Sequence, residues 1–412
     1  MQPTDRLHAL DAVRAFALLA GLGLHASMAY LPGMPNLVLT PAPEHAKSAA
    51  LAVTFFVIHV FRMTTFFMIA GFFARQMLRS KGVIGFIRNR LVRIAVPLLV
   101  GWPLVIAAIA GLWIWGVAIA FHGAPPPKPP TPANPPLLAF PLTHLWFLYV
   151  LLELYAATLL LRGLVVVIDR KGRLRDAVGG LFTSLVRSGL APILFAVPIA
   201  ALLAIAPGWE PWFGIPTPDS SLIASPAAAM AFGLTFWCGW LLQKRVELLQ
   251  VLASRWMLNL TLAIGLGGAV LAVRGLTPAE ALAHPPAYQL PLALAYAGAA
   301  WSSAFALIGL AVRFLSRPSA PIRYVADASY WIYVAHLPLV YALNVLLSGL
   351  AWPAEAKFAV VVGAATTLLL MTYQLFVRYS FIGAVMNGRR SHQVRGRRLG
   401  DQSLAQTLTG TF

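Results

Sequence analysis

Apolar segments long enough to cross a lipid bilayer recur along almost the whole chain. They fall near residues 8–30, 50–73, 94–121, 140–161, 188–207, 225–243, 256–273, 290–312, 328–349 and 358–383. A helix of about 20 apolar residues spans the hydrocarbon core and satisfies its own backbone hydrogen bonds there. Only 11% of the 412 residues are charged, against about 25% in soluble proteins. The sequence therefore predicts an all-α, polytopic membrane bundle of about ten transmembrane helices.

The Lys and Arg residues are unevenly distributed between alternate connections. Of the 31 basic residues, two lie within spans, and the connections on one side hold only Lys47, Lys128, Arg274 and Lys357. The positive-inside rule then places both termini in the cytoplasm. The net charge of +18 comes from residues that punctuate apolar segments. We therefore expect these charges to orient the helices in a lipid bilayer, and we expect no nucleic acid partner.

The chain divides into a membrane domain, residues 1–386, and a polar, basic tail, residues 387–412. The composition of the tail predicts a disordered cytoplasmic segment. Residues 122–136, HGAPPPKPPTPANPP, predict a stiff polyproline-like connection. Trp209 and Trp212 fall in an outer loop, where aromatic side chains are expected to lie at the membrane interface.

Several classes of chemistry lack their sequence signatures. The single cysteine, Cys238, excludes an internal disulfide and a cysteine metal cluster. HExxH, Walker and GxSxG motifs are absent from the sequence, so metal, nucleotide-hydrolysis and serine-hydrolase chemistry have no support. The first apolar segment contains Asp11 and Arg14, which distinguishes it from a cleaved signal peptide.

Arg14 and His25 lie eleven residues apart in that first segment. Eleven residues turn a helix through about 1100°, so the two side chains share one face and lie roughly 16 Å apart along the axis. Placing ionisable side chains inside the membrane costs free energy, and such residues usually have a function. Arg14 would meet an anion from the cytoplasm, and the gap approximates an extended coenzyme A pantetheine arm. Alternatively, Asp11 and Arg14 form a structural pair one turn apart, and His25 binds a backbone carbonyl.

Three further arginines stand out. Arg90 and Arg93, one turn apart in RNRLVRIAVP, suit bidentate phosphate binding, although positive-inside anchoring also explains them. Arg62 lies near the middle of the second span, one turn after His59. It is too deep to reach the interface easily, so it needs an acid or a bound anion. Glu153 is either that structural partner or a second acid.

Two aromatic side chains in later spans complete the candidates. Trp146, in HLWFLYVLLELY, shares a helix face with Glu153 seven residues on, and it is either a packing residue or part of a site. His336 precedes Pro338, whose ring frees the carbonyl of Val334 for other polar groups. A satisfied core histidine is the alternative for His336.

The segments LDAVRAFALLAGLGLH, FRMTTFFMIAGFF, RNRLVRIAVPLL, HLWFLYVLL and ASYWIYVAHLPLV occur in this order between residue 10 and about residue 340. Together they resemble the membrane acyltransferase-3 family, and most closely its osmoregulated periplasmic glucan succinyltransferase branch. The resemblance implies a ten-helix, multi-pass enzyme of the bacterial inner membrane, with residues 1–386 as the acyltransferase domain. It also implies transfer of an acyl group from a cytoplasmic acyl-CoA to a hydroxyl of a periplasmic glucan or another surface polysaccharide.

The resemblance assigns roles to individual residues. The family's first-helix arginine and histidine correspond to Arg14 and His25, and its paired arginines correspond to Arg90 and Arg93. Trp146 and His336 match the tryptophan and the late histidine. Glu153 has no clear counterpart, and residues 387–412 match nothing in the family.

A sugar hydroxyl is a poor nucleophile, so we expect His25 to remove its proton as it attacks the thioester. Trp146, His336 or Arg62, in that order, would supply an oxyanion donor. Arg14, Arg90 and Arg93 would bind the nucleotide phosphates. No bound cofactor is expected. Succinyl-CoA or acetyl-CoA would be the donor substrate, with Arg62 holding the free carboxylate of a succinyl group.

The sequence is also compatible with other mechanisms and functions. An acyl-histidine intermediate at His25 and direct transfer are not separated by sequence. A transporter or flippase for a glycan or a lipid-linked intermediate fits ten helices and buried charges equally well, although inverted repeats are not visible. A structural membrane subunit would not explain Arg14 together with His25.

Overall fold

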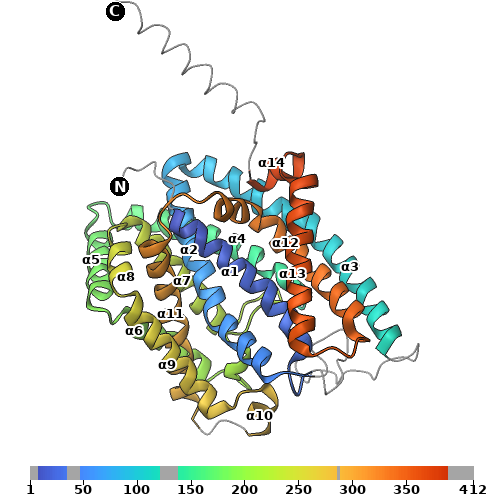
Figure 1. The fold of residues 1–412 in the computed structure, drawn as a ribbon. Coiled ribbons are helices and arrows are strands. Elements are labelled where there is room, and N and C mark those ends of the chain that lie inside the picture. The colour runs from blue at the N-terminus through green and yellow to red at the C-terminus, as the bar shows by residue number, and fades with distance from the viewer. Residues whose placement is uncertain (1–7, 35–46, 121–137, 285–287, 388–412) are drawn as a thin grey trace, which may run out of the picture.

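The computed structural model describes residues 8–34, 47–120, 138–284 and 288–387 (Figure 1). Within these ranges the chain is helical, and the extended pairing is limited to one isolated bridge between Ala139 and Ser221. The helices are α1 (His8–Ser27), α2 (Ala49–Arg90), α3 (Val96–Ala120), α4 (Trp146–Ile168), α5 (Arg173–Ser188), α6 (Ala191–Ala204), α7 (Pro226–Lys244), α8 (Leu248–Ser254), α9 (Trp256–Arg274), α10 (Pro278–Ala283), α11 (Gln289–Phe314), α12 (Ala320–Ser348), α13 (Ala354–Thr372) and α14 (Phe381–Asn387). The predicted all-α class is confirmed.

Each of the ten predicted apolar segments overlaps one of these helices, namely α1, α2, α3, α4, α6, α7, α9, α11, α12 or α13. By length and composition, seven helical stretches in the described ranges qualify as membrane spans, or eight if a bent pair counts as one. One of the seven, Ala49–Ile119, joins two predicted segments. The chain is thus a multi-pass membrane protein, while the number of ten spans stays a prediction.

Helix α2 is longer than a single span requires. Its 42 residues correspond to about 63 Å of helix, and the chain changes direction at Gly82, which has φ 67° and ψ −178°. Only glycine adopts this conformation without strain. The segment after Gly82 carries Arg90, and a π-helical turn, Leu91–Ala95, carries Arg93 into α3. Such turns are frequent at functional sites.

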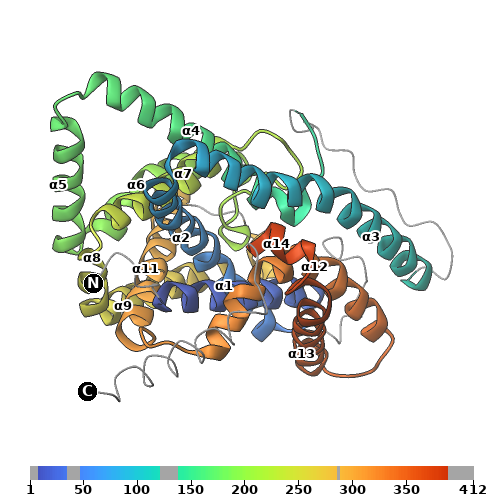
Figure 2. The same cartoon turned by 90° about the horizontal axis from the view of Figure 1, so that it is seen from above.

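Helix α1 lies inside the bundle and contacts α2, α11, α12 and α13 (Figure 2). Helix α3 instead projects from one side of the molecule (Figures 1 and 2). Its side chains Leu99 and Leu104 are 73% and 67% exposed, which suits contact with lipid. The beginning of α1 and helix α14 lie at the same end of the bundle (Figure 1). We call this the basic end, because Arg79, Lys81 and Lys244 lie toward it.

Two glycines allow α2 and α7 to approach each other closely. A Cβ atom added at Gly71 would lie 1.8 Å from the carbonyl oxygen of Phe236, and one added at Gly239 would lie 1.8 Å from that of Met68. The two backbones are therefore in direct contact at two places. Small residues at helix interfaces are the usual means of close packing in membranes.

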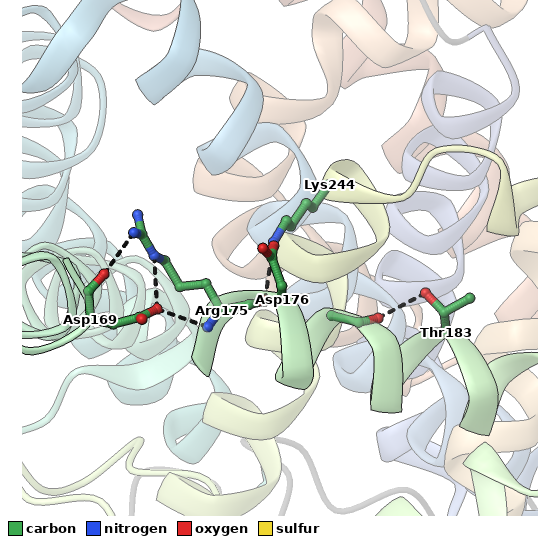
Figure 3. Close-up of polar contacts among 6 residues, drawn as sticks. Asp169, Arg175, Asp176, Thr183 and Lys244 are labelled. Carbon is green, nitrogen blue, oxygen red and sulfur yellow. Dashed lines mark hydrogen bonds and ion pairs between the residues drawn. The ribbon is translucent and has the colours of Figure 1, made fainter. Parts of the chain in front are cut away.

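The connection from α4 to α5 is held by a compact polar cluster (Figure 3). The carboxylate of Asp169 accepts hydrogen bonds from the backbone N–H and Nε of Arg175, at 2.9 and 3.1 Å. The Nη2 of Arg175 in turn donates to the carbonyl of Asp169, at 2.8 Å. These bonds hold the pKa of Asp169 below its usual value. Helix α5 then meets α6 at an angle of 109°, so α5 runs across the direction of the neighbouring span.

The loop between α6 and α7 differs from expectation. Trp209 and Trp212 are 5% and 0% exposed, so both indoles are covered by protein and do not face lipid, while their position at the level of the membrane interface stays a prediction. Trp212 packs on Phe56 of α2, and Trp209 packs on Tyr296 of α11. The loop folds inward over the bundle, because burying both indoles removes more apolar surface from water than the interface would. The predicted connection 122–136 lies outside the described residues, as does the predicted tail 387–412 except for Asn387, which ends α14.

Candidate functional site

A cavity of about 1430 Å³ lies between α1, α2, α4 and α12 and extends to the α6–α7 loop at the end opposite the basic end. Its lining includes most of the candidate residues from the sequence, namely Arg14, His25, Arg62, Arg90, Arg93, Trp146 and His336. Asp11 lies beside the cavity through its partner Arg14. The chain thus brings together residues from positions 14 to 336 in one space.

The basic end of the cavity holds Arg14 in a fixed position. Its Nη2 lies 3.3 Å from Oδ1 of Asp11, which is the ion pair expected from their spacing. The same nitrogen donates to the carbonyl of Ala326 on α12, at 2.7 Å. Asp11 is 6% exposed, so the pair buries a charge that would otherwise be costly in the membrane. Arg14 therefore presents its cation to the cavity from a rigid base.

Arg90 reaches the same end from the segment after Gly82. Its guanidinium lies over the rings of Phe86 and Tyr155, at 5.5 and 5.1 Å from their centroids, and its Nη1 donates to the Tyr155 hydroxyl at 3.3 Å. Stacking fixes the plane of the guanidinium while leaving N–H groups for an anion. The carbonyl of the neighbouring Arg93 accepts a hydrogen bond from Tyr330, at 2.5 Å.

Several cations at the basic end of the cavity were not predicted from the sequence as site residues. Arg79, Lys81 and Lys244 also line the cavity, although the positive-inside pattern treats all three as membrane anchors. The only signal for them was their position just after a span, which they share with most basic residues of the chain. Their inclusion extends the positive potential from Arg14 to the rim of the cavity.

Arg62 lies deeper, at the level of Gly21 on α1. A Cβ atom added at Gly21 would lie 2.6 Å from Nη1 of Arg62, so the guanidinium occupies the space that the missing side chain leaves. Among the described residues no carboxylate forms an ion pair with Arg62. Glu153 is exposed and hydrogen-bonded to Tyr149, and it does not line the cavity. Neither role left open for Glu153 therefore fits its position.

Three histidines meet one helical turn beyond Arg62. The ring centroids of His25 and His336 lie 5.1 Å apart, and those of His144 and His336 lie 5.0 Å apart. Helices α1 and α12 run parallel, because Arg14 contacts Ala326 and His25 contacts His336. The span between these two contacts is about 15 Å on either helix.

Hydrogen bonds fix the tautomers of two of these histidines. Nδ1 of His336 faces the carbonyls of Ile332 and Tyr333, at 3.1 and 2.7 Å, and Nε2 of His144 faces the carbonyl of Val334, at 3.2 Å. A carbonyl only accepts, so these nitrogens carry the protons. The carbonyl of Val334 is the one that Pro338 was expected to free. Neutral His336 therefore presents a buried Nε2 lone pair, which has no partner among the described residues.

His25 is held differently. Its Nδ1 is buried without a hydrogen-bond partner in the described ranges, and no backbone carbonyl there binds its ring. The alternative in which His25 serves only as a carbonyl donor thus finds no support. No backbone carbonyl therefore fixes the tautomer of His25, whereas His336 holds a proton on Nδ1.

Trp146 is 5% exposed and packs on Phe67 and Phe232, while part of it lines the cavity. It therefore combines the packing role and the site position that the sequence left as alternatives. His144, two residues earlier, is the site residue that the sequence argument overlooked. The signal was present, because His144 opens the same HLWFL run.

Asp219 and Tyr341 line the opposite mouth of the cavity. Asp219 lies in the α6–α7 loop and is exposed. Its backbone carbonyl accepts a hydrogen bond from the N–H of Thr143, at 2.8 Å, which places the loop directly beside His144. The basic end of the lining thus holds arginines and lysines together with Glu247 and Asp327, the middle holds the histidines, and the far mouth holds Asp219.

The described helices thus form a multi-pass membrane protein with a large cavity lined by arginines, histidines and carboxylates. The model of the acyltransferase-3 family, described as an acyltransferase domain, matches residues 7–374. The chain belongs to this family and is a membrane acyltransferase.

Among curated proteins the chain is similar to glucans biosynthesis protein C of Salmonella typhimurium, Salmonella typhi and Salmonella schwarzengrund. Each is 31% identical over 106 residues, which are 25% of this chain and 25% of the relative. The similarity thus spans about a quarter of the length of these relatives. No solved structure matches the chain.

Proposed function

We propose that the protein transfers a succinyl or acetyl group from a cytoplasmic acyl-CoA to a hydroxyl of a periplasmic glucan or another cell-surface glycan. The observation that carries the proposal is a cavity whose lining joins Arg14, Arg90 and Arg93 with His25, His144 and His336. The positive-inside rule assigns the basic end to the cytoplasm, where acyl-CoA is found. The names of the Salmonella relatives support a glucan as the acceptor.

Arg14, Arg90 and Arg93 would bind the donor phosphates, because their guanidinium groups lie at the basic end without blocking the cavity. The distance of about 15 Å from Arg14 to the histidines matches ten to eleven helical residues. An extended pantetheine arm covers such a distance, so the thioester would lie beside His25 and His336. Arg79, Lys81 and Lys244 add positive charge along the entry route.

The reaction joins the acceptor oxygen to the acyl carbon. As the hydroxyl oxygen attacks the thioester carbonyl, His25 takes the hydroxyl proton, the C–S bond breaks, and the proton passes to the departing thiolate. The products are the acyl ester and coenzyme A. General-base assistance of this kind contributes typically 10²–10⁴-fold to a rate.

The hydrogen bonds of His336 bear on the choice of oxyanion donor. With Nδ1 donating to the carbonyls of α12, the neutral ring of His336 offers a lone pair at Nε2, and in that form it accepts a hydrogen bond instead of donating one to an oxyanion. Arg62 carries N–H groups one helical turn from His25, and Trp146 lines the same space. We therefore assign oxyanion stabilisation to Trp146 or Arg62, and we assign to His336 a supporting role as a proton acceptor.

Transfer across proteoliposomes tests this function. Acyl-labelled succinyl-CoA or acetyl-CoA is supplied on the side of the basic end, and periplasmic glucan on the other side. Wild type is compared with His25→Ala and with His8→Ala. His8 lies on the same helix as His25, but outside the cavity, so it serves as a matched control.

Label on the glucan with wild type and His8→Ala, and its loss with His25→Ala, is the expected result. A folded His25→Ala variant that transfers label at the wild-type rate would contradict the role of His25. Failure of wild type to transfer either acyl group to any glycan, although it is folded in the vesicle, would overturn the proposed function.

A further inference from the structure

The α6–α7 loop is held rigidly over the far mouth of the cavity. Its Glu210 forms a buried ion pair with Arg274 of α9, at 2.5 Å, and Arg274 also donates to the carbonyl of His284, at 2.6 Å. Further along, the loop pairs with residues 138–143, where Phe140 donates to the carbonyl of Ser220, at 3.0 Å. The backbone of Asp219 is thus fixed between two anchors.

Asp219 is unusual among the charged residues of the cavity. The described lining contains three carboxylates, and Asp219 is the one at the far mouth, since Glu247 and Asp327 lie toward the basic end. Its carboxylate is hydrogen-bonded by Ser220 and lies within electrostatic range of the Tyr341 phenol. No described cation pairs with it. An exposed carboxylate that lines the cavity without a cation is available to a ligand that donates hydrogen bonds.

The position of Asp219 relates it to the histidines. Its carbonyl binds the N–H of Thr143, the residue before His144, and His144 lies 5.0 Å from His336. Tyr341 is five residues beyond His336 on α12, which is about 7.5 Å along the helix. A ring held by Asp219 and Tyr341 would therefore extend one of its hydroxyls toward His25 and His336.

The charge of Asp219 selects the class of ligand. An anion entering from this side would be repelled, while hydroxyl groups donate readily to a carboxylate. The donor, with its phosphates, is attracted to the opposite end by arginines. The two mouths are therefore suited to substrates of different charge, an anionic donor and a neutral, hydroxyl-rich acceptor.

We propose that Asp219 and Tyr341 form the binding site for the acceptor and that this site selects neutral sugar units over units that already carry an acidic acyl group. The proposal rests on the proposed function and adds to it the location and the charge selectivity of the acceptor site. Such a site limits repeated modification of one region of a glycan, because a succinylated unit brings a second negative charge to Asp219.

The test measures transfer kinetics with two acceptors, neutral glucan and glucan already succinylated, at saturating acyl-CoA. Wild type should prefer the neutral glucan. Asp219→Asn, which keeps the shape and removes the charge, should raise the apparent KM for neutral glucan by about 10–100-fold, as expected for a lost hydrogen bond to a charged group. It should also bring the kcat/KM values of the two acceptors closer together, while the KM for acyl-CoA stays unchanged.

Glu355→Gln is the matched control. Glu355 is an exposed carboxylate at the start of α13 that accepts a hydrogen bond from Ser48 and lies outside the cavity, so Glu355→Gln removes one carboxylate charge without touching the cavity. Tyr341→Phe is a second variant that keeps the ring and should raise the acceptor KM severalfold. It keeps the proposal testable if Asp219→Asn does not fold.

The outcomes distinguish a failure of the proposed function from a failure of the inferred acceptor site. If wild type transfers no acyl group to glycans, the proposed function fails. If wild type transfers label, but neither Asp219→Asn nor Tyr341→Phe changes the acceptor KM, the inferred site is wrong. Equal preference of wild type for neutral and succinylated glucan would likewise overturn the proposed charge selectivity.

Discussion

Hydrogen bonds give the three clustered histidines different properties, although their side chains are chemically identical. His336 and His144 each direct one ring nitrogen to a backbone carbonyl, which fixes the position of the proton. His25 has no such bond within the described ranges. In the proposed reaction His25 takes a proton and later releases it, which a fixed tautomer would hinder. The main-chain carbonyls of α12 thus distinguish His144 and His336 from His25.

The bond from His144 to Val334 leads to a stability prediction. His144→Phe keeps an aromatic ring but leaves the carbonyl of Val334 without its donor, because Pro338 cannot supply a backbone N–H. We expect the free energy of unfolding to fall by about 1–3 kcal/mol, measured by thermal unfolding in detergent. His284→Phe, at an exposed position, is the control. An unchanged unfolding temperature in His144→Phe would show that the bond contributes nothing.

Arg62 is predicted to determine the choice of acyl group. Arg62→Leu should lower kcat/KM for succinyl-CoA by about 10–100-fold more than for acetyl-CoA, because a charge-assisted hydrogen bond to the succinyl carboxylate is lost. Gly21→Ala should act in the same direction, since its methyl group displaces the guanidinium. Gly23→Ala is the matched control, because a Cβ there meets its nearest neighbour at 3.7 Å. Equal losses with both donors would leave Arg62 without a role in selecting the acyl group.

Arg88 and Arg90 allow phosphate binding to be separated from membrane anchoring. Both arginines lie in the same segment, but only Arg90 lines the cavity. Arg90→Gln should raise the KM for acyl-CoA by about tenfold, with kcat little changed, because it removes binding shared by ground and transition states. Arg88→Gln should leave both constants near wild type. Equal effects of the two substitutions would favour anchoring, and a fall in kcat alone would place Arg90 in the chemistry.

At the scale of elements, the periodicity of the chain predicts much of what is observed. Each apolar segment overlaps a helix, and the spacing of Arg14 and His25 correctly places both on one face. Sequence could not show that α12 runs parallel to α1 in matching register, which is what joins His336 to His25. Nor could it place Asp219, because the α6–α7 loop owes its position to the buried indoles and to the Glu210–Arg274 pair. Such contacts join segments far apart in the chain and leave no local pattern.

The close contact of α2 with α7 gives a prediction at this scale. Gly71→Ala places a methyl group against the carbonyl of Phe236, which belongs to a backbone and cannot move aside easily. The two helices must separate, so we expect a loss of about 1–3 kcal/mol in stability and reduced activity, since α2 carries Arg62. Thermal unfolding and transfer assays measure both. Gly163→Ala, where nothing lies within 4 Å, should be neutral, and a neutral Gly71→Ala would contradict the packing.

At the scale of the whole molecule, the distribution of charge gives the cavity a direction. The cations that anchor the protein by the positive-inside rule also make the basic end attractive to an anionic donor. Under the proposed function, the residues that are predicted to set the orientation in the membrane would also set the side from which acyl-CoA enters. The far mouth would carry little positive charge for the same reason, because Lys and Arg are sparse in the connections predicted on that side.

This polarity is testable with thiol labelling, because Cys238 is the one native cysteine and is 3% exposed. In a Cys238→Ala background, Lys81→Cys and Thr217→Cys place single thiols at the basic and far mouths. A membrane-impermeant maleimide should label Thr217→Cys in spheroplasts and Lys81→Cys only in inverted vesicles. Arg88→Cys places a thiol outside the cavity and is the control for protection by ligands.

Ligands should then protect each thiol from its own side. Coenzyme A should slow labelling of Lys81→Cys but not of Arg88→Cys, and neutral glucan should slow labelling of Thr217→Cys. Protection of each mouth by its own substrate follows only if the cavity takes donor and acceptor from opposite faces of the membrane. Labelling of both mouths from the same face would contradict the predicted orientation, and with it the transfer of an acyl group across the bilayer.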